Sequence, residues 1–478
     1  MRKTFLAVAI AVAGATTVVP AASAAPATLD WGPCPAGAFP TPDLQCTTLK
    51  VPLDYRDPGG RTIDVAVSRL PSKNPEKRRG VLLTNPGGPG GGGLDYPQLL
   101  KYVKLPQDVL DSYDIVGFDP RGVAHSTPVT CDLTPEQIAV GNLPYANGPA
   151  DVVKQAALAK QEAKQCAEAK TGSMLPYVTT ANTARDMDRI RTALGESKVS
   201  FLGASYGTYL GAVYTTLFPE RSDRFVLDSS LGPGGYDIDA MRGFGRGMED
   251  RFPDFAAFAA AHPEYGLGTT PAQVTAKFHE LAARLDREPI EGVTGSVFRG
   301  LTFEGLYVTD LTQLAKDWQG LDQGRAPKPP QAPVTGVENL LASRFAVICG
   351  DSAWPRSIAS YQVDVAVDRI RYPLLGAASA NIGACAYWAP PAEPQVRITG
   401  HGPANVLMVQ NQRDPGTPLS GARKLRAAFG ERARMITIDQ GGHGAYPFTA
   451  GECGKTLVTE YLVSGKRPGD TYCAAQSR

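Results

Sequence analysis

The feature that most constrains this chain is a tight turn, Gly203-Ala-Ser-Tyr-Gly207, set between an apolar segment and a helical one. We predict a strand over 198–202 and a helix over 206–218. The flanking glycines allow close packing of strand on helix around a strained Ser205. The serine hydroxyl then projects from the sheet edge at a helix N-terminus, which favours developing negative charge. This context predicts a nucleophilic serine; the alternative is an ordinary glycine-rich turn.

Strand-like and helix-like segments alternate in two parts of the chain, which is typical of βα units and a mainly parallel sheet with helices on both faces. Expected strands are 48–55, 62–70, 80–84, 114–119, 198–202, 223–228, 405–410 and 434–439, and expected helices are 150–169, 183–194, 206–218 and 419–429. The alternation stops between about 235 and 400. We therefore predict a sheet domain over 25–234 and 401–478, with a small excursion at 131–176. A mostly helical insertion at 235–400, called the cap below, precedes the penultimate strand.

The first 24 residues have the pattern of a secretory signal peptide. Arg2 and Lys3 precede an apolar run at 4–19, and Ala22-Ser-Ala24 fits an A-x-A cleavage site. No later stretch reaches the ~20 apolar residues of a membrane-spanning helix. We therefore expect a secreted mature chain without a membrane anchor. The formal net charge of +1 and the lack of a long basic run argue against nucleic acid as a partner.

The cysteine count is even and all cysteines follow the expected signal peptide, which predicts disulfides in an exported chain. About 105 pairings are possible for eight cysteines. Pairing neighbours in chain order is the simplest arrangement, because each bridge then closes a local loop. The absence of C-x-x-C spacing disfavours a zinc site. The cysteines are Cys34, Cys46, Cys131, Cys166, Cys349, Cys385, Cys453 and Cys473.

A base and an acid are expected downstream of the serine, because a serine hydroxyl attacks only once a base takes its proton. His443 lies in Gln440-Gly-Gly-His-Gly444, just after the strand at 434–439, and is the predicted base. Asp414 follows the strand at 405–410 and is the predicted acid. Asp228, at the end of an earlier strand, is the alternative acid, and either aspartate could instead cap a turn. We expect no catalytic role for the remaining histidines, His125, His262, His279 and His401.

A glycine-rich loop, Asn85-Pro-Gly-Gly-Pro-Gly-Gly-Gly-Gly93, follows the strand at 80–84. It lacks the G-K-[ST] of a phosphate-binding loop. We expect it to form an oxyanion hole, in which the backbone N–H groups near Gly88 and of Tyr206 point at a carbonyl oxygen as it becomes tetrahedral. A side chain here would block the approach of a substrate. The alternative is a flexible surface loop.

Five motifs together resemble the proline iminopeptidase and tripeptidyl aminopeptidase group of α/β-hydrolases, in particular its exported actinobacterial-type members. They extend over most of the mature chain, and their order and spacing agree with the group. They are Asn85-Pro-Gly-Gly-Pro-Gly90, resembling H-G-G-P-G; Asp119-Pro-Arg-Gly-Val-Ala-His-Ser126, resembling D-x-R-G-x-G-x-S; Gly203 to Gly207; Arg413-Asp-Pro-Gly-Thr-Pro418; and Gly441-Gly-His-Gly444. Asn85 departs from the usual His and Ala124 from a Gly. The first departure is typical of the longer exported branch and disfavours simple proline iminopeptidase activity.

The resemblance implies an α/β-hydrolase fold and a serine exopeptidase that releases short peptides, often tripeptides, from free N-termini through an acyl-enzyme. Peptides are the implied partners, and neither a metal nor an organic cofactor is needed. A substrate ammonium entering a cleft must pair with an anion. The cap candidates are Asp237, Asp239, Glu304 and Asp351. Asp351 is favoured because Cys349 and Trp354 flank it, although any of the four could be a solvated surface acid.

A secreted esterase or lipase with the same triad is the main alternative, because triad and oxyanion hole do not distinguish an ester from an amide. A buried acid in the cap would favour the peptidase, and an all-apolar cleft would favour the esterase. A non-catalytic binding protein on this fold would have lost Ser205, His443 or the acid. All three are present.

Overall fold

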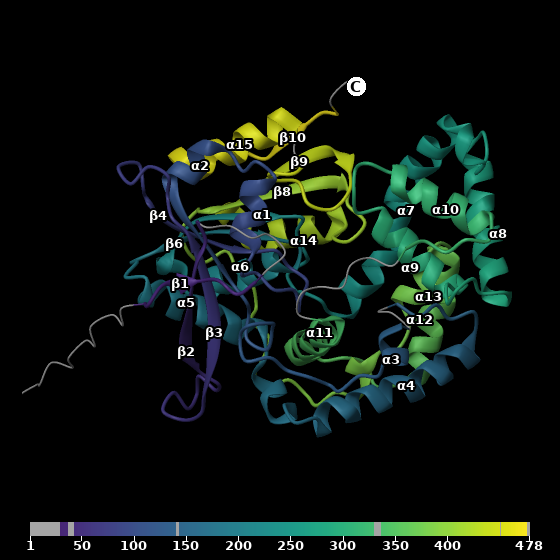
Figure 1. Cartoon of the computed structure of the whole chain (residues 1–478), viewed down its shortest axis with the longest axis horizontal. Helices are drawn as coiled ribbons and strands as arrows, with labels where there is room; N and C mark the ends of the chain where they lie inside the picture. Colours follow the sequence, from purple (N-terminus) through teal and green to yellow (C-terminus); the bar gives the residue numbers. More distant parts are fainter. Residues whose placement is uncertain (1–28, 37–42, 140–142, 329–335, 450, 476–478) are drawn as a thin grey trace, which may run out of the picture.

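A mostly parallel sheet forms the centre of the protein (Figure 1), whose computed structural model describes residues 29–36, 43–139, 143–328, 336–449 and 451–475. The strands lie in the order β1-β2-β3-β5-β4-β6-β7-β8-β9-β10. Neighbours are antiparallel from β1 to β5 and parallel from β5 to β10. The strands are β1 (Gly32–Pro33), β2 (Gln45–Pro52), β3 (Thr62–Leu70), β4 (Gly80–Asn85), β5 (Tyr113–Phe118), β6 (Val199–Ala204), β7 (Ser222–Asp228), β8 (Val406–Arg413), β9 (Ala433–Gly441) and β10 (Thr471–Cys473).

Helices connect the parallel strands and fill the long insertion between β7 and β8. They are α1 (Tyr96–Tyr102), α2 (Gln107–Ser112), α3 (Pro135–Ala139), α4 (Pro149–Glu168), α5 (Thr180–Ala193), α6 (Tyr206–Leu217), α7 (Ile238–Ala261), α8 (Pro271–Arg287), α9 (Gly295–Gly305), α10 (Thr312–Asp322), α11 (Val337–Asp351), α12 (Ile358–Arg371), α13 (Gly376–Ser379), α14 (Leu419–Phe429) and α15 (Gly451–Ser464). Short 3-10 turns lie at Gly172–Tyr177, Pro219–Arg221, Pro263–Tyr265, Ala384–Tyr387 and Gly430–Arg432.

The central strands are buried on both faces, which explains why they read as continuous apolar runs. Successive side chains of a strand point to opposite faces of the sheet. Leu82 and Leu202 pack in the core that contains residues of α1, α2 and α15. Their neighbours Leu83 and Phe201 pack in the core that contains residues of α5, α6 and α14. The expected α/β-hydrolase fold, with a mainly parallel sheet, helices on both faces and a helical insertion, is confirmed.

The cap helices α7 to α10, α12 and α13 lie together on the right of Figure 1. An aromatic cluster holds this part together, and it accounts for the many aromatic residues of the insertion. Ring centroids in the cluster are 4.8–6.1 Å apart, and its members are Phe252, Phe255, Phe278, Phe298 and Trp318. Helix α4, from the excursion at 131–176, packs against α12 and the turn at Ala384–Tyr387. The two insertions therefore form one helical layer.

The sheet has two short strands that sequence periodicity did not predict, β1 and β10, each at an edge. Strands of two or three residues are too short to show an alternating pattern. Because β10 follows β9, the cap precedes the third strand from the end rather than the penultimate one. Helix α5 begins three residues earlier than expected, and the Thr179 side chain caps it by accepting a hydrogen bond from the Asn182 N–H.

All eight cysteines are paired, and neighbours in chain order are bonded as predicted. The bridges are Cys34–Cys46, Cys131–Cys166, Cys349–Cys385 and Cys453–Cys473. The first and last of them secure the short edge strands β1 and β10. The expected signal peptide, residues 1–24, lies outside the described residues. Within those residues, no helix combines the length and the apolar character needed to span a membrane.

Helix α7 of the cap contacts the loop after β8 at Gly247. A Cβ atom at this position would lie 2.1 Å from the carbonyl oxygen of Pro415. On the same helix, a Cβ atom at Gly243 would meet nothing within 4 Å. The backbone of α7 therefore touches the loop that carries Asp414, and only glycine fits at the contact.

We expect Gly247→Ala to destabilise the protein by about 1–3 kcal/mol, because the added methyl group forces α7 away from Pro415. Gly243→Ala is the matched control and should be neutral or stabilise by up to ~1 kcal/mol, as alanine favours a helix. Denaturant unfolding of the two variants measures the difference. An equal change in the free energy of unfolding of the two variants would contradict the close contact between Gly247 and Pro415.

Candidate active site

Ser205 occupies the turn between β6 and α6, with φ 56° and ψ −126°. This left-handed conformation strains a residue other than glycine. The Ser205 N–H donates a hydrogen bond to the Asp228 carbonyl oxygen at 2.9 Å. A Cβ atom on Gly203 would lie 2.4 Å from the Phe201 ring, and one on Gly207 would lie 2.7 Å from the Asn85 carbonyl oxygen. Both glycines of the motif are therefore required by close packing.

The predicted base and acid are in contact. His443 Nδ1 lies 2.9 Å from Asp414 Oδ1 and 3.0 Å from Oδ2. The Asp414 carboxylate also accepts hydrogen bonds from the N–H groups of Gly416 and Thr417, which fix it in the loop after β8. Ser205 and His443 both line one cavity of about 540 Å3. A serine, a histidine and a carboxylate thus meet at the carboxyl edge of the sheet.

The electrostatics of the pair favour a protonated imidazole. Burial lowers the pKa of His443, but the charge and hydrogen bond of Asp414 and the charge of Asp228 outweigh this effect. The pKa of His443 is consequently raised above its usual value. A histidine in this setting readily accepts a proton from a neighbouring hydroxyl.

Asp228, the alternative acid, is buried beneath the loop that carries His443. Its carboxylate accepts hydrogen bonds from the backbone N–H groups of Ala445 and Tyr446 and from the Ser229 hydroxyl. Burial raises the pKa of Asp228 to about 7. Its side chain therefore holds the loop, whereas Asp414 contacts the imidazole.

The glycine-rich loop after β4 lies against the serine. Gly88 lines the cavity. A Cβ atom on Gly87 would lie 2.8 Å from Ser205 Cβ and 3.1 Å from the Tyr206 nitrogen. Asn85 Oδ1 accepts a hydrogen bond from the Gly87 N–H at 3.0 Å. The asparagine that departs from the related motif therefore fixes the start of this loop.

The motif at 119–126 supports the same loop from its far end. Asp119 Oδ1 accepts hydrogen bonds from the N–H groups of Gly93 and Leu94. Arg121 forms a fully buried ion pair with Asp186 of α5 at 2.6 Å. The resemblance in this segment thus reflects support of the loop, and its residues do not line the cavity with Ser205.

Helix α11 of the cap packs against the glycine-rich loop and against the segment 119–126. A Cβ atom on Gly90 would lie 2.3 Å from the Leu340 carbonyl oxygen. Asn339 accepts a hydrogen bond from the Ala124 N–H and donates one to the Gly122 carbonyl oxygen. Ala124, which stands where the related motif has glycine, has φ 53°. Contacts from α11 therefore hold a strained residue next to the loop.

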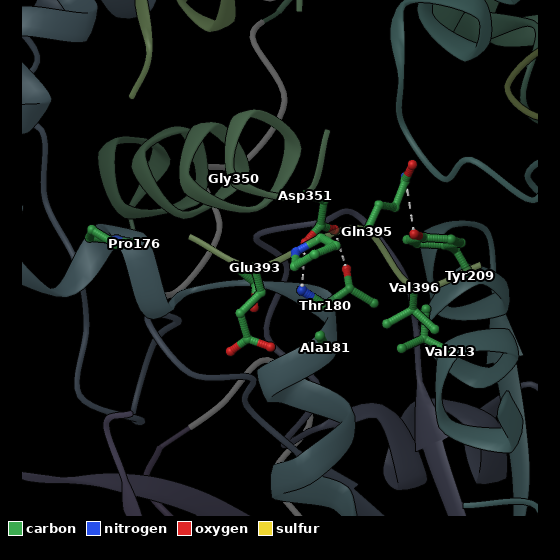
Figure 2. A pocket seen from close by; sticks show the side chains of 12 residues that line it. Pro176, Thr180, Ala181, Tyr209, Val213, Gly350, Asp351, Glu393, Gln395 and Val396 are labelled. Carbon is green, nitrogen blue, oxygen red and sulfur yellow. Dashed lines mark hydrogen bonds between the residues drawn. The ribbon is translucent and has the colours of Figure 1, made fainter. Parts of the chain in front are cut away.

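Asp351, at the C-terminus of α11, is joined to the turn after Ser205 by a chain of hydrogen bonds. Its carboxylate accepts bonds from the N–H (2.9 Å) and hydroxyl (2.5 Å) of Thr180 (Figure 2). The Tyr206 hydroxyl lies 2.5 Å from Thr180 Oγ1. Burial raises the pKa of Asp351 to about 6. Asp351, the favoured acid for a substrate ammonium, lines a separate small pocket and supports Tyr206 instead.

Of the four candidate acids in the cap, Glu304 is the one that lines the cavity with Ser205 and His443. Burial raises the pKa of Glu304, and the charge of Arg344 offsets part of that rise. Asp237 caps α7 by accepting a hydrogen bond from the Ala240 N–H, and with Asp239 it lines a different pocket.

Three further residues of the cap line the cavity. The sequence suggested Tyr307 only as one of several aromatic residues of the insertion that could line a cleft, and it gave no sign of Tyr236 or Arg344, because the insertion carries no motif. Tyr307 packs its ring 4.8 Å from the His443 ring, and its carbonyl oxygen accepts the His443 N–H at 2.6 Å. Tyr236 lines the cavity together with Ser205, and burial raises the pKa of its hydroxyl. Arg344 is the third.

The other histidines lie elsewhere. His125 bonds Asp119, His262 bonds Glu264, His279 packs on Phe278 and His401 is exposed. In the described part of the chain, no group of three or more His, Cys, Asp or Glu side chains is arranged to hold a metal ion.

Comparisons with known proteins identify relatives of the whole chain. The family model described as TAP-like protein matches residues 372–473. The chain is 36% identical to Tripeptidyl aminopeptidase of Streptomyces lividans, with 95% of this chain and 88% of the relative covered. The chain belongs to the tripeptidyl aminopeptidase family. The chain is also similar to Serine protease Hip1 of Mycobacterium tuberculosis, at 29% identity over 92% of this chain and 89% of the relative.

The family resemblance drawn from the motifs is thereby confirmed, and the protein is a serine hydrolase. A further relative is Carboxylesterase B of Mycobacterium tuberculosis, at 32% identity over 92% of this chain and 88% of the relative.

We expect Asp414→Asn to lower kcat by about 10³–10⁴-fold, since the amide no longer stabilises an imidazolium. The base works only when neutral, so the raised pKa of His443 sets the acid limb of the pH profile above the usual histidine range. Removing the carboxylate lowers that pKa and shifts the limb to lower pH. Measured kcat/KM against pH tests this.

Asp228→Asn is the comparison variant. Its amide faces two backbone N–H donors, so it should mainly reduce stability and move the acid limb less than Asp414→Asn. A larger loss of kcat in Asp228→Asn would favour the alternative acid.

We expect Thr180→Val to destabilise the protein by about 1–3 kcal/mol, because Tyr206 and Asp351 each lose a partner in the interior. The matched control is Thr183→Val on the same helix. Its hydroxyl bonds the Thr179 carbonyl oxygen, which keeps its backbone partner. Urea unfolding measures the free energy of unfolding of both variants. An equal loss of stability would show that the hydrogen bonds from Asp351 through Thr180 to Tyr206 add no stability of their own.

Proposed function

We propose that the protein is an exported serine exopeptidase that releases tripeptides from free peptide N-termini. The observation that carries this proposal is the Glu304 carboxylate in the same cavity as Ser205 and His443. A carboxylate there can pair with the ammonium group of a substrate, which would otherwise be costly to bring into a cleft.

Catalysis follows from the roles we assign to the triad. Ser205 Oγ attacks the scissile carbonyl carbon while His443 takes its proton, and Asp414 orients and stabilises the imidazolium. Backbone N–H groups near Gly88 and of Tyr206 stabilise the oxyanion. His443 then protonates the leaving amine, and an acyl-enzyme remains on Ser205. Water, activated by His443, releases the peptide.

The cap supports the exopeptidase assignment. Its residues Phe244, Phe303 and Tyr307 share the walls of the cavity with Ser205. A cavity of about 540 Å3, roofed in this way, suits a short unfolded chain end and excludes a folded protein. The names of the Streptomyces lividans and Mycobacterium tuberculosis relatives, an aminopeptidase and a serine protease, support the same assignment.

Export is supported by the four disulfides, which persist in oxidising compartments, and by the signal-like pattern at 1–24.

An esterase is the second candidate, favoured by the apolar walls of the cavity and by the relative named Carboxylesterase B. Its substrates would be esters without an ammonium group, and Glu304 would have no partner in them.

The test compares a tripeptide anilide that has a free N-terminus with its N-acetylated form. We expect the free form to be cleaved at least ~100-fold better, because acetylation removes the contact with Glu304. Glu304→Gln should lose most of this preference, whereas Asp239→Asn, an acid of the cap outside the cavity, should keep it. Ser205→Ala should abolish cleavage.

Equal cleavage of both forms would overturn the exopeptidase proposal. Hydrolysis of a p-nitrophenyl ester by the same preparation, with no anilide cleavage, would favour the esterase.

A further inference from the structure

A second cavity of about 100 Å3 adjoins the active-site cavity and lies between α4, α7 and α11. Leu143 and Arg344 line both cavities. Two cavities that share two lining residues lie next to each other. A group that extended from Ser205 past these two side chains would enter the second cavity.

The walls of the second cavity are mainly apolar. Leu341, Phe345 and Ile348 lie along one face of α11, at helical spacing, and Met241 and Trp354 join them. Such walls suit the aliphatic part of a side chain rather than a bare ion.

One carboxylate lies among these apolar walls. Gln155, Ala159, Glu162 and Cys166 follow the inward face of α4 at helical spacing, and Ala159 and Cys166 are fully buried. Glu162 lines the second cavity. Among the residues that the structure describes, it forms neither a hydrogen bond nor an ion pair. Burial alone raises the pKa of Glu162 to about 7.

Arg344 lines both cavities, but its positive charge does not offset the negative charge of Glu162. The Arg344 guanidinium lies 5.7 Å from the Tyr236 ring centroid and acts on Glu304, on the side of the active-site cavity. It has no part in the raised pKa of Glu162. The second cavity therefore holds a half-buried carboxylate, without a hydrogen-bond or ion-pair partner among the described residues, between mainly apolar walls. A cationic ligand would supply the missing partner.

We propose that the second cavity is a substrate subsite for a lysine or arginine side chain of the peptide, whose cationic end binds Glu162. The apolar walls would contact the aliphatic stem, and the carboxylate would pair with the charge. The inference rests on the proposed peptidase function and adds a residue preference to it. The other occupant to consider is the substrate's own N-terminal ammonium, which the test below separates.

The experiment uses tripeptide anilides with free N-termini. Lysine, norleucine or glutamate replaces alanine at one of the three positions at a time. For the wild-type enzyme we expect, at one position, a kcat/KM for lysine about tenfold or more above norleucine, with glutamate lowest. Norleucine retains the aliphatic stem without the charge, so the comparison isolates the ion pair.

Glu162→Gln should lower kcat/KM for the lysine substrate by roughly 10–100-fold, mainly through KM, and affect the norleucine substrate far less. Glu162→Lys should reverse the preference towards glutamate at the same position. The matched control is Glu168→Gln on the same helix, whose side chain is 67% exposed beside Lys164. It should leave all substrates unchanged.

Each contrary outcome has a distinct meaning. Equal losses for lysine and norleucine, or no lysine preference in a wild-type enzyme that cleaves the all-alanine substrate, would overturn the subsite. Loss of the free-over-acetylated preference in Glu162→Gln would assign the carboxylate to the N-terminal ammonium instead. A wild-type enzyme without that preference would instead overturn the proposed function.

Discussion

The left-handed backbone of Ser205 is the constraint around which the neighbouring elements are packed. Such a conformation costs of the order of 1–3 kcal/mol and persists only where the surroundings impose it. The Asp228 carbonyl oxygen binds its N–H, and Gly87 packs directly on its side chain. Ser229 and Ala124, at neighbouring loops, also have positive φ values of 59° and 53°. Residues with strained backbones are thus concentrated at one edge of the sheet. The buried strands that precede them hold them in this conformation.

The cap contacts the segments that carry His443 and Asp414 and the turn that follows Ser205. Tyr307 packs on His443, and Gly247 lies against the loop of Asp414. Helix α11 contacts the glycine-rich loop and, through Asp351 and Thr180, the tyrosine that follows the serine. Helices that form the roof of the cavity are therefore also part of the scaffold that orients the reacting groups. Folding of the cap and assembly of the site are coupled.

Local patterns explain which parts the sequence could predict. Ser205, His443 and Asp414 each lie in a short motif beside an apolar strand, and the disulfides follow chain order. The cap acids have no such context. Asp351 was favoured because Cys349 and Trp354 flank it in the sequence. Its carboxylate instead accepts hydrogen bonds from Thr180, and Glu304 is the acid that lines the cavity. The direction of a side chain on a helix depends on packing between distant segments. For the same reason, no motif marked Tyr307 or Glu162.

The contact between Tyr307 and His443 bears on how such proteins can be re-engineered. A cap that only covered the cleft could be exchanged between relatives to alter selectivity. Here the backbone of Tyr307 binds the backbone of the histidine, and α7 fits the loop after β8 only where glycine is present. A transplanted cap must bring these matching surfaces with it. Chimeras with junctions chosen from sequence alone will lose turnover before they change preference.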